Sequence, residues 1–397
     1  MSGIVIVGAG LGGLRAAESA RVAGYQGPIT MIGDEPHLPY TRPPLSKEGL
    51  AAGIDVAALE FRRKRSLDDV DWLMHRAAVG CDLAAREVHL NDGREVAFDA
   101  LVVASGIRAR RLPLPGPAEG RYLLRTADDA LRLRERLTAG ARVVVLGSGF
   151  IGCEVAATAR SLGCEVCVVA LDPVPLHRPL GAHLGAAMQR RHESHGVRFQ
   201  LSRTIDVLHG SGSQVRSVGL SDGTELPADV IVEAVGSVPN VEWLAGNGLD
   251  LSDGVLVDSA MQVVASPAPM VAVGDICRHP NALFGPVPRR VEHWSVPTAT
   301  GRRAGATVAS LLAGEQPDQS PFAVLPSFWS DQYAYQLQSF GMPDLADRIV
   351  VAEGDVDGPC IVEYFDATGL VGVVGVDRTP DLAPYRASLL DRPLLAD

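Results

Sequence analysis

Two short runs of β-branched and other apolar residues stand out along the chain, because each is followed at once by closely spaced glycines. The first run, residues 4–7, leads into Gly8-Ala-Gly-Leu-Gly-Gly, and the second, residues 143–146, leads into Gly147-Ser-Gly-Phe-Ile-Gly. A short apolar run bounded by glycines predicts a buried strand. Each predicted strand therefore enters the pattern G-x-G-x-x-G.

The segments after these glycines have the composition of helices. An alanine-rich stretch ends at Gly24 in the first copy, and a similar stretch ends at Gly163 in the second. A glycine directly after a helical stretch is a typical helix end. Apolar runs resume at residues 29–32 and 166–169, and we predict both to be strands. Both copies are thus strand–helix–strand units.

The similarity between the two copies continues beyond these units. An Asp-Gly pair, at 92–93 and again at 222–223, separates two short strand-like runs and predicts a hairpin turn. Counted from the glycine of that pair, an aspartate follows 6 residues later and another glycine follows 13 residues later. These residues are Asp99 and Gly106 in the first copy, and Asp229 and Gly236 in the second. The matching offsets indicate two copies of one nucleotide-binding fold.

The glycines of the two patterns are suited to pyrophosphate binding. The first of each set allows the turn from strand to helix, the second lets the backbone approach a phosphate, and the third lets the helix pack on the strand. The helix N-terminus that follows offers unpaired N–H groups and partial positive charge. We expect Gly8, Gly10 and Gly13 to bind one dinucleotide, and Gly147, Gly149 and Gly152 to bind a second.

The acidic residue that normally binds the adenosine ribose differs between the copies. In the first copy Glu35, or its neighbour Asp34, follows the second strand. In the second copy that strand ends at Ala170, and Asp172 comes two residues later. An acid favours NAD and a nearby arginine favours NADP, and Arg178 can serve a phosphate of either coenzyme. The sequence therefore leaves NADH and NADPH both open.

Charge and cysteine content narrow the class of protein. The 397 residues carry 36 basic and 47 acidic side chains, a formal charge of −11, which argues against nucleic acid or an anionic membrane as a partner. No run approaches the length of roughly 18 apolar residues that a membrane span needs. No basic segment precedes the first apolar run, as it would in an export signal. The six cysteines are scattered. We expect a cytoplasmic protein of two or three domains.

Further stretches resemble one family closely. Residues 34–47 read Asp-Glu-Pro-His-Leu-Pro-Tyr-Thr-Arg-Pro-Pro-Leu-Ser-Lys, and a Val-Gly-Asp element ends at Asp275. A Glu-His-Trp element ends at Trp294, and residues 327–333 read Ser-Phe-Trp-Ser-Asp-Gln-Tyr. In this order, over nearly the whole chain, they resemble the FAD-dependent NAD(P)H:ferredoxin reductases of bacterial oxygenase systems, the putidaredoxin-reductase-like group.

The resemblance implies an α/β fold with two Rossmann-like dinucleotide-binding domains, as in glutathione reductase, and a C-terminal α+β domain. The FAD domain is split by the NAD domain in this fold, because the chain returns to the first domain after the second copy. We expect the FAD domain at residues 1–110 and 239–318, the NAD(P) domain at 111–238, and the C-terminal domain at 319–397.

The resemblance also implies contacts with FAD. Arg42 and Lys47 match positions at the flavin pyrophosphate and ring. Arg125 matches another FAD contact, and Asp275 matches a residue that holds a ribityl hydroxyl. Trp294 matches a position whose backbone faces the pyrimidine edge of the flavin, where a helix N-terminus would stabilise negative charge.

Three more positions follow from the resemblance. Val79 matches a residue whose backbone meets adenine, with a plain core valine as the alternative. Glu154 matches a position near the nicotinamide, and Trp329 matches an aromatic residue beside the flavin. Lys47, Glu154 and Trp329 are therefore our candidates for the catalytic centre, and Gly236 of the second copy is a further candidate for cofactor binding.

Thiol and metal chemistry are not expected. The closely spaced Cys164 and Cys167 lie on a predicted strand, where residues three apart point to opposite faces. Their spacing also lacks the second half of a zinc site. We expect both to be core residues and the protein to have no metal site.

The expected activity combines these elements. NAD(P)H gives a hydride to FAD, and two electrons pass singly to a [2Fe–2S] ferredoxin that serves a cytochrome P450 or a Rieske oxygenase. Ferredoxins are acidic, so a protein of net charge −11 needs a local basic patch for docking. Candidates for this patch are residues 62–65, Arg289 with Arg290, and Arg302 with Arg303.

Three other functions fit the same residues. A rubredoxin reductase has the same chemistry with a different carrier, and an NADH oxidase would need an oxygen-reactive flavin. An apoptosis-inducing-factor-like flavoprotein would sense NADH, with slow turnover and a change in partner binding. Reduction of purified carriers, peroxide formation and stable charge-transfer complexes distinguish these alternatives.

Overall fold

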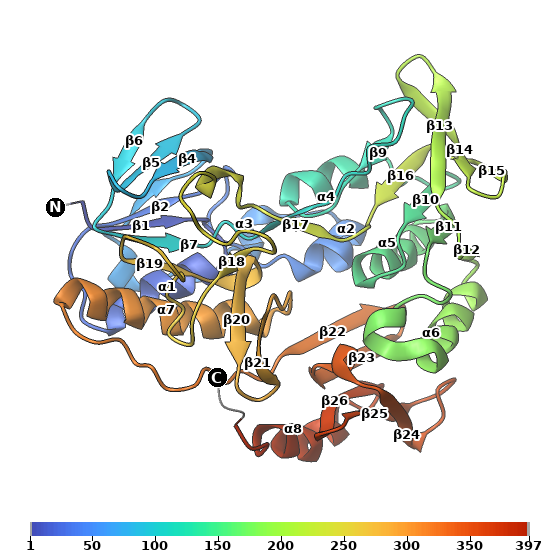
Figure 1. Ribbon diagram of the computed structural model, residues 1–397. Helices are drawn as coiled ribbons and strands as arrows, with labels where there is room; N and C mark the ends of the chain where they lie inside the picture. Colours follow the sequence, from blue (N-terminus) through green and yellow to red (C-terminus); the bar gives the residue numbers. More distant parts are fainter. Residues whose placement is uncertain (1, 395–397) are drawn as a thin grey trace.

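The two apolar runs form the central strands of two separate parallel sheets in the computed structural model, which describes residues 2–394 (Figure 1). The first sheet has the order β19–β7–β1–β2–β3, and all its pairings are parallel. Its strands are β1 (Ile4–Val7), β2 (Ile29–Ile32), β3 (Asp71–Leu73), β7 (Ala100–Val103) and β19 (Met270–Ala272). Because β19 follows the second copy in sequence, the chain returns to complete the first sheet.

The second sheet has the order β12–β11–β10–β16–β9 and is also parallel. Its strands are β9 (Arg121–Tyr122), β10 (Arg142–Leu146), β11 (Glu165–Ala170), β12 (Arg198–Leu201) and β16 (Val230–Glu233). The predicted strand–helix–strand units are confirmed, since helix α1 (Leu11–Val22) connects β1 to β2 and helix α5 (Phe150–Ser161) connects β10 to β11.

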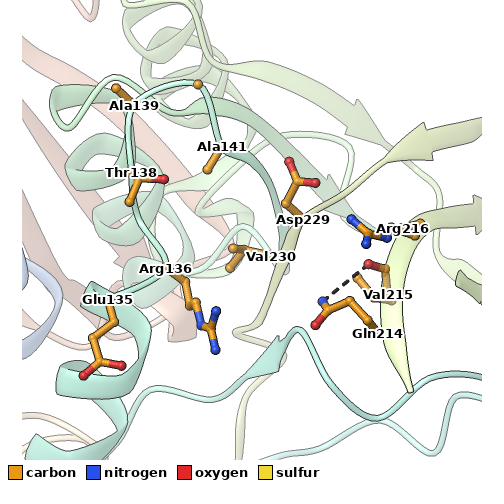
Figure 2. Close-up of a pocket in the computed structure, with 11 residues that line it drawn as sticks. Glu135, Arg136, Thr138, Ala139, Ala141, Gln214, Val215, Arg216, Asp229 and Val230 are labelled. Atoms are coloured by element: carbon orange, nitrogen blue, oxygen red, sulfur yellow. Dashed lines mark hydrogen bonds between the residues drawn. The ribbon is translucent and has the colours of Figure 1, made fainter. Parts of the chain in front are cut away.

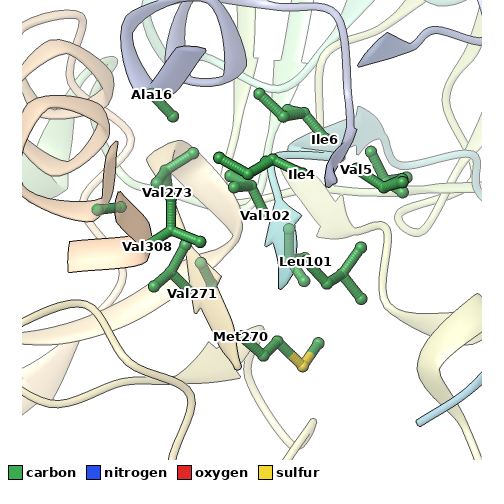
Figure 3. Close-up of a cluster of buried hydrophobic side chains, with 14 of the residues drawn as sticks. Ile4, Val5, Ile6, Ala16, Leu101, Val102, Met270, Val271, Val273 and Val308 are labelled. Atoms are coloured by element: carbon green, nitrogen blue, oxygen red, sulfur yellow. The ribbon is translucent and has the colours of Figure 1, made fainter. Parts of the chain in front are cut away.

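The first sheet is covered by α1 and by the long helix α7 (Ser295–Ala313), which runs beside α1 (Figure 1). Glycine makes this close approach possible, because a Cβ at Gly305 would lie 2.2 Å from the carbonyl oxygen of Ala16. Figure 3 shows the core beneath these helices, where Ile4 and Ile6 of β1, Val102 of β7 and Val271 of β19 come together. These side chains are almost completely buried.

A small antiparallel sheet follows each strand–helix–strand unit. These sheets contain β4 (Ala78–Asp82), β5 (Glu87–Leu90) and β6 (Glu95–Ala97), and β13 (Ile205–Ser211), β14 (Gln214–Leu220) and β15 (Glu225–Pro227). The predicted hairpins are confirmed, with Gly93 and Gly223 at φ values of 86° and 84° in the turns. A positive φ is a conformation that glycine adopts without strain.

The repeated aspartates have a structural role. Asp99 Oδ2 accepts a hydrogen bond of 2.7 Å from the Gly3 backbone N–H, directly before β1. Asp229 Oδ2 accepts one of 3.0 Å from the Arg142 N–H at the start of β10. Each aspartate therefore fixes the entry to the first strand of its own copy, which explains the matching offsets.

The first lobe is built on the first parallel sheet and the second lobe on the second sheet. Two segments of the chain cross between these lobes, and they pair with each other. β8 (Ile107–Ala109) follows the first copy, β17 (Ser237–Pro239) follows the second, and they form a two-stranded antiparallel sheet. Side chains reinforce it, since Asn240 Nδ2 donates to the Ser105 carbonyl at 2.8 Å and Ser105 Oγ donates to the Asn240 carbonyl at 2.9 Å.

The C-terminal lobe is a five-stranded antiparallel sheet of order β22–β23–β26–β25–β24 with helix α8 (Ala383–Leu390) against it. Its strands are β22 (Ser327–Gln332), β23 (Tyr335–Gly341), β24 (Arg348–Gly354), β25 (Cys360–Asp366) and β26 (Gly369–Val376). The sheet packs on helix α6 (His177–Ser194) of the second lobe, where Tyr364 donates a 2.9 Å hydrogen bond to the Leu180 carbonyl (Figure 1). The predicted fold class is confirmed.

Shorter elements complete the described chain. They are α2 (Glu48–Ala52), α3 (Val56–Leu59), α4 (Ala127–Arg134), β18 (Val255–Leu256), β20 (Cys277–Asn281) and β21 (Gly285–Arg289), with 3₁₀ turns at Pro43–Ser46, Arg65–Leu67, Glu242–Leu244, Gly274–Ile276, Pro343–Leu345 and Thr379–Leu382. Within residues 2–394, no helix has the length and apolar character needed to cross a bilayer. Residues 395–397, the end of the last predicted segment, lie outside the described part of the chain.

Candidate dinucleotide and redox site

The first and third glycines of each pattern are fixed by packing. A Cβ at Gly8 would lie 2.0 Å from the Ala104 carbonyl oxygen, and one at Gly147 would lie 2.3 Å from the Ala234 carbonyl oxygen. Both residues also have positive φ values, 119° and 93°. A Cβ at Gly13 or Gly152 would lie within 2.2 Å of the carbonyl oxygen of the first glycine of its own pattern. Both turns thus have the same geometry.

The second glycines differ, because open space lies beside them. Within the described chain, no other part of the protein comes within 4 Å of a Cβ built on Gly10 or Gly149, apart from the residues adjacent to each glycine in sequence. Their φ values, −105° and −74°, are ordinary for any residue. Each glycine is also the N-cap of its helix, so no N-cap side chain accepts from the free backbone N–H groups of the first turn. Two equivalent positions therefore fit a dinucleotide phosphate.

The second turn carries unsatisfied polar atoms as well. Ser148 Oγ and His177 Nδ1 are buried and have no hydrogen-bond partner in the described part of the chain. The Leu176 N–H donates 2.9 Å to the Ser148 carbonyl, which draws the start of α6 against this turn. Buried polar atoms are normally paired, so these two indicate a bound polar group.

A polar cluster lies in the first lobe around Arg42. Arg42 Nη2 lies 2.5 Å from Glu35 Oε1, and Tyr40 donates a 2.5 Å hydrogen bond to Glu35 Oε2. Arg42 Nη1 also donates to the Arg125 carbonyl at 2.8 Å, and Arg125 Nη2 donates to Asp275 Oδ2 at 3.0 Å. Burial raises the pKa of Asp275, and Arg125 opposes that rise. The structure thus brings together four of the residues predicted to contact FAD.

The Val-Gly-Asp element reaches the first glycine turn through the returning chain. The Gly274 N–H donates to Thr300 Oγ1 of α7 at 3.0 Å. A Cβ at Gly12, inside the first turn, would lie 3.1 Å from Val273 Cγ2. Asp275 therefore lies where the N-terminal regions of α1 and α7 meet.

Lys47 and Glu154 form a buried ion pair. Lys47 Nζ lies 3.2 Å from Glu154 Oε1, and their side chains are only 10% and 4% exposed. Ser46 Oγ donates to Glu154 Oε2 at 2.5 Å, and Ser330 Oγ donates to Oε1 at 2.6 Å. Burial raises the pKa of Glu154, while Lys47 and the two serines act in the opposite direction.

Two tryptophans lie next to this pair. Lys47 Nζ is 5.7 Å from the centroid of the Trp329 ring, within range of a cation–π interaction. The Trp329 and Trp294 rings meet edge to face, with centroids 5.7 Å apart. Trp294 is 43% exposed at the N-cap of α7. The three predicted catalytic candidates, Lys47, Glu154 and Trp329, are thus in one cluster with Trp294.

Three other predicted residues lie outside this cluster. Val79 on β4 is 59% exposed, so the alternative of a core valine is wrong. Arg178 is exposed near the start of α6, and its side chain shows no hydrogen bond or ion pair within residues 2–394. Gly236, with a φ of 91°, directly precedes β17.

A cavity of about 600 Å³ lies elsewhere. It is lined by Arg136, Gln214, Arg216 and Asp229 among others (Figure 2). Residues 139–141 and Asp229 precede β10 and β16, so it lies at the N-terminal edge of the second sheet. Gly147 follows the opposite end of β10. Dinucleotides bind beyond the carboxyl ends of such strands, so this hollow is not the coenzyme site.

Sequence reasoning missed Tyr40, Ser46 and Ser330. Each contacts a predicted residue, either Glu35 or Glu154. For the two serines, the sequence offered only their position next to a candidate residue, since Ser46 directly precedes Lys47 and Ser330 directly follows Trp329. A serine beside a candidate residue is too common to be selected from one sequence.

Comparison with known proteins shows the family of the chain. The family model described as pyridine nucleotide-disulphide oxidoreductase matches residues 2–301, and the model described as reductase C-terminal matches residues 327–393. The chain is 35% identical to rhodocoxin reductase of Rhodococcus erythropolis, over 98% of this chain and 90% of that protein. It is 36% identical to the anthranilate 1,2-dioxygenase system ferredoxin–NAD(+) reductase component of Burkholderia cepacia, over 96% and 92%.

A solved structure gives the same result. The ferredoxin reductase for the CYP199A2 system from Rhodopseudomonas palustris superimposes with a TM-score of 0.91 at 34% identity, covering 99% of this chain and 96% of that one. The present chain therefore belongs to the pyridine nucleotide-disulphide oxidoreductase family. Within that family it groups with the FAD- and NAD(P)H-dependent ferredoxin reductases of oxygenase systems, so the resemblance seen in the sequence is confirmed.

Proposed function

We propose that this protein oxidises NADH or NADPH and delivers the electrons to a [2Fe–2S] ferredoxin that supplies a cytochrome P450 or a Rieske oxygenase. FAD, when bound, takes up two electrons as a hydride and returns them one at a time. The chain's own part would be to bind both nucleotides and orient them for this transfer.

The Lys47–Glu154 ion pair carries this proposal. Lys47 ends the segment that follows the first dinucleotide-binding unit, while Glu154 lies on α5, the helix that begins at the second glycine turn. Their contact therefore joins the two units next to the partly buried Trp329. A buried cation held at this junction is suited to stabilise negative charge on a flavin ring.

The remaining assignments belong to the same proposal. The residues that we assign to FAD are Gly8, Gly10, Gly13, Glu35, Arg42, Val79, Arg125, Asp275 and Trp294. The residues that we assign to the nicotinamide coenzyme are Gly147, Gly149, Gly152, Glu154, Arg178 and Gly236. The division at 1–110, 111–238, 239–318 and 319–397 is supported by β19, which places part of segment 239–318 in the first sheet.

The six free cysteines support a cytoplasmic location, because reduced thiols are typical of that compartment. Burial raises the pKa of Cys81 to about 12, and it raises the pKa of Cys153 and of Cys277 further. A thiol with a raised pKa is a poor nucleophile. This favours electron transfer to an external carrier over transfer to a cysteine of the chain.

Stopped-flow spectroscopy of the purified flavoprotein tests the proposal. NADH and NADPH are mixed with it in turn, and the reduced protein is then mixed with a [2Fe–2S] ferredoxin, a rubredoxin or oxygen. Fast flavin bleaching followed by fast ferredoxin reduction is the expected result. Fast peroxide formation without a carrier would indicate an NADH oxidase, and a stable charge-transfer complex without carrier reduction would indicate an apoptosis-inducing-factor-like protein.

A further inference from the structure

A chain of buried polar side chains leads from Glu154 into the C-terminal lobe. Ser330 Oγ lies 2.6 Å from Glu154 Oε1, and Gln332 Nε2 lies 2.9 Å from Ser330 Oγ. His192 Nε2 on α6 then lies 2.7 Å from Gln332 Oε1. The residues Ser330, Gln332 and His192 are at most 2% exposed. This row of hydrogen-bonded side chains thus connects α6, by way of β22, to the ion pair of Lys47 and Glu154.

The hydrogen bonds of this chain have one direction. Ser330 has a single hydroxyl proton and donates it to the Glu154 carboxylate, so its oxygen must accept from the Gln332 amide N–H. The Gln332 carbonyl oxygen then accepts from His192 Nε2, which fixes the imidazole tautomer, and it also accepts from the Tyr335 hydroxyl at 3.3 Å. His192 Nδ1 is left as the acceptor for the Tyr333 hydroxyl at 3.3 Å.

We propose that Ser330, Gln332 and His192 are positioning residues that hold the Glu154 carboxylate ionised and oriented toward Lys47. The inference rests on the proposed function, in which Glu154 faces the nicotinamide. Each of these three hydrogen bonds is donated in the direction of Glu154, so the bonds polarise one another and favour the charged carboxylate. The motif at residues 327–333 of the C-terminal lobe thereby acts on Glu154 of the lobe that would bind the nicotinamide coenzyme.

The surroundings of both ends agree with this role. Glu154 faces Lys47 and Ser46 from one segment and Ser330 from β22, while Cys153 is the neighbouring titratable group on its own helix. At the other end, His192 packs edge to face against Phe199 of β12 and Tyr333, and His195 lies one turn further along the chain. The rings keep His192 in place without adding a carboxylate that would charge it.

The pH dependence of flavin reduction tests the proposal. In Ser330→Ala the ionised form of Glu154 loses a donor, so the acid limb of the limiting rate with NADH should move up by about one pH unit. His192→Phe keeps the ring packing and should move the limb in the same direction by a smaller amount. Ser339→Ala is the matched control, because Ser339 is equally buried on β23 and its hydroxyl has no partner in the described chain.

A second readout does not depend on activity. ¹⁵N NMR of the flavin-loaded protein should show neutral His192 protonated at Nε2, and Glu154→Gln should reduce the share of that tautomer. Unchanged pH profiles in both Ser330→Ala and His192→Phe, or a proton on Nδ1 in the wild type, would overturn the proposal. Failure of both coenzymes to reduce the wild-type flavin would instead refute the proposed function, while the tautomer would still be measurable.

Discussion

Lys47 Nζ and Glu154 Oε1 lie 3.2 Å apart and are the meeting point of the two dinucleotide-binding units. Lys47 comes from the loop after the first unit, and Glu154 comes from the first helix of the second. Both side chains are buried, so removing one charge should destabilise the other more than it would in an exposed ion pair. Their mutual dependence is open to direct measurement.

Lys47→Met should leave the buried Glu154 carboxylate without its cation. Removing one partner of a buried pair costs about 3 kcal/mol or more, because the remaining charge is uncompensated. The double variant with Glu154→Gln should lose much less than the sum of the two single variants. Thermal unfolding of the flavin-loaded proteins measures this coupling, and strictly additive losses would show that the pair is not coupled.

Gly149→Val should fold but bind NAD⁺ at least about tenfold more weakly, because its side chain fills the open space at the N-terminus of α5. Gly10→Val should correspondingly lose flavin. Gly147→Ala differs from both, since its Cβ would clash with the Ala234 carbonyl and the fold itself should suffer. Flavin content, NAD⁺ titration and circular dichroism of the three variants separate these outcomes; normal NAD⁺ affinity in Gly149→Val would contradict our placement of the coenzyme.

Leu171→Glu should shift the coenzyme preference toward NADH. Leu171 is 74% exposed directly after β11, where an acid usually binds the ribose hydroxyls and repels the 2′-phosphate of NADPH. We expect the ratio of kcat/KM for NADH over NADPH to rise roughly tenfold. Val264→Glu, at an exposed position of the first lobe, adds the same charge as a control and should leave the ratio unchanged.

Arg302→Glu should slow ferredoxin reduction more than Arg303→Glu does. Arg303 is already paired with Asp318 at 2.7 Å, and Arg290 is paired with Asp253 and Glu292. Arg302 is exposed and shows no ion pair among residues 2–394, so its charge is available to an acidic partner. The expected signature is a lower bimolecular rate with a weaker salt dependence; equal effects of both reversals would contradict it.

His192 should make the folded state sensitive to acid. Burial lowers its pKa from the ordinary 6.5 to about 4, so between these values the unfolded chain binds more protons than the folded one. Stability therefore falls as the pH is lowered from about 6.5 to about 4, by up to about 3 kcal/mol for this residue. Thermal unfolding at pH 7 and pH 4.5 should show a smaller loss in His192→Phe, whereas the exposed His183→Gln should behave as the wild type.

The repeated parts of the fold could be predicted because their determinants are local. The strands around the two glycine patterns, the hairpins at Gly93 and Gly223, and the helix that begins near Pro297 each depend on residues only a few positions apart. Cys164 and Cys167 likewise lie in hydrophobic clusters on opposite faces of the second sheet, as their spacing predicted.

The contacts around Glu154 could not be predicted in the same way. Ser46 and Ser330 are 108 and 176 residues from Glu154 in sequence, and no local pattern links them. The edge strand β9 has only two residues, so it carries no periodicity of its own. The resemblance to a known family placed Lys47, Glu154 and Trp329 as candidates for one site, and the folded chain then showed which serines hold the carboxylate between them.

The pairing of β8 with β17 has a mechanical consequence. The outgoing and returning segments between the first two lobes are joined by backbone hydrogen bonds. Arg108 adds hydrogen bonds to the side chains of Asn240 and Glu242. A rotation of one lobe against the other must therefore twist a ribbon two strands wide, which is much stiffer than a single extended linker. The relative orientation of these two lobes should accordingly change little when a coenzyme binds to the second one.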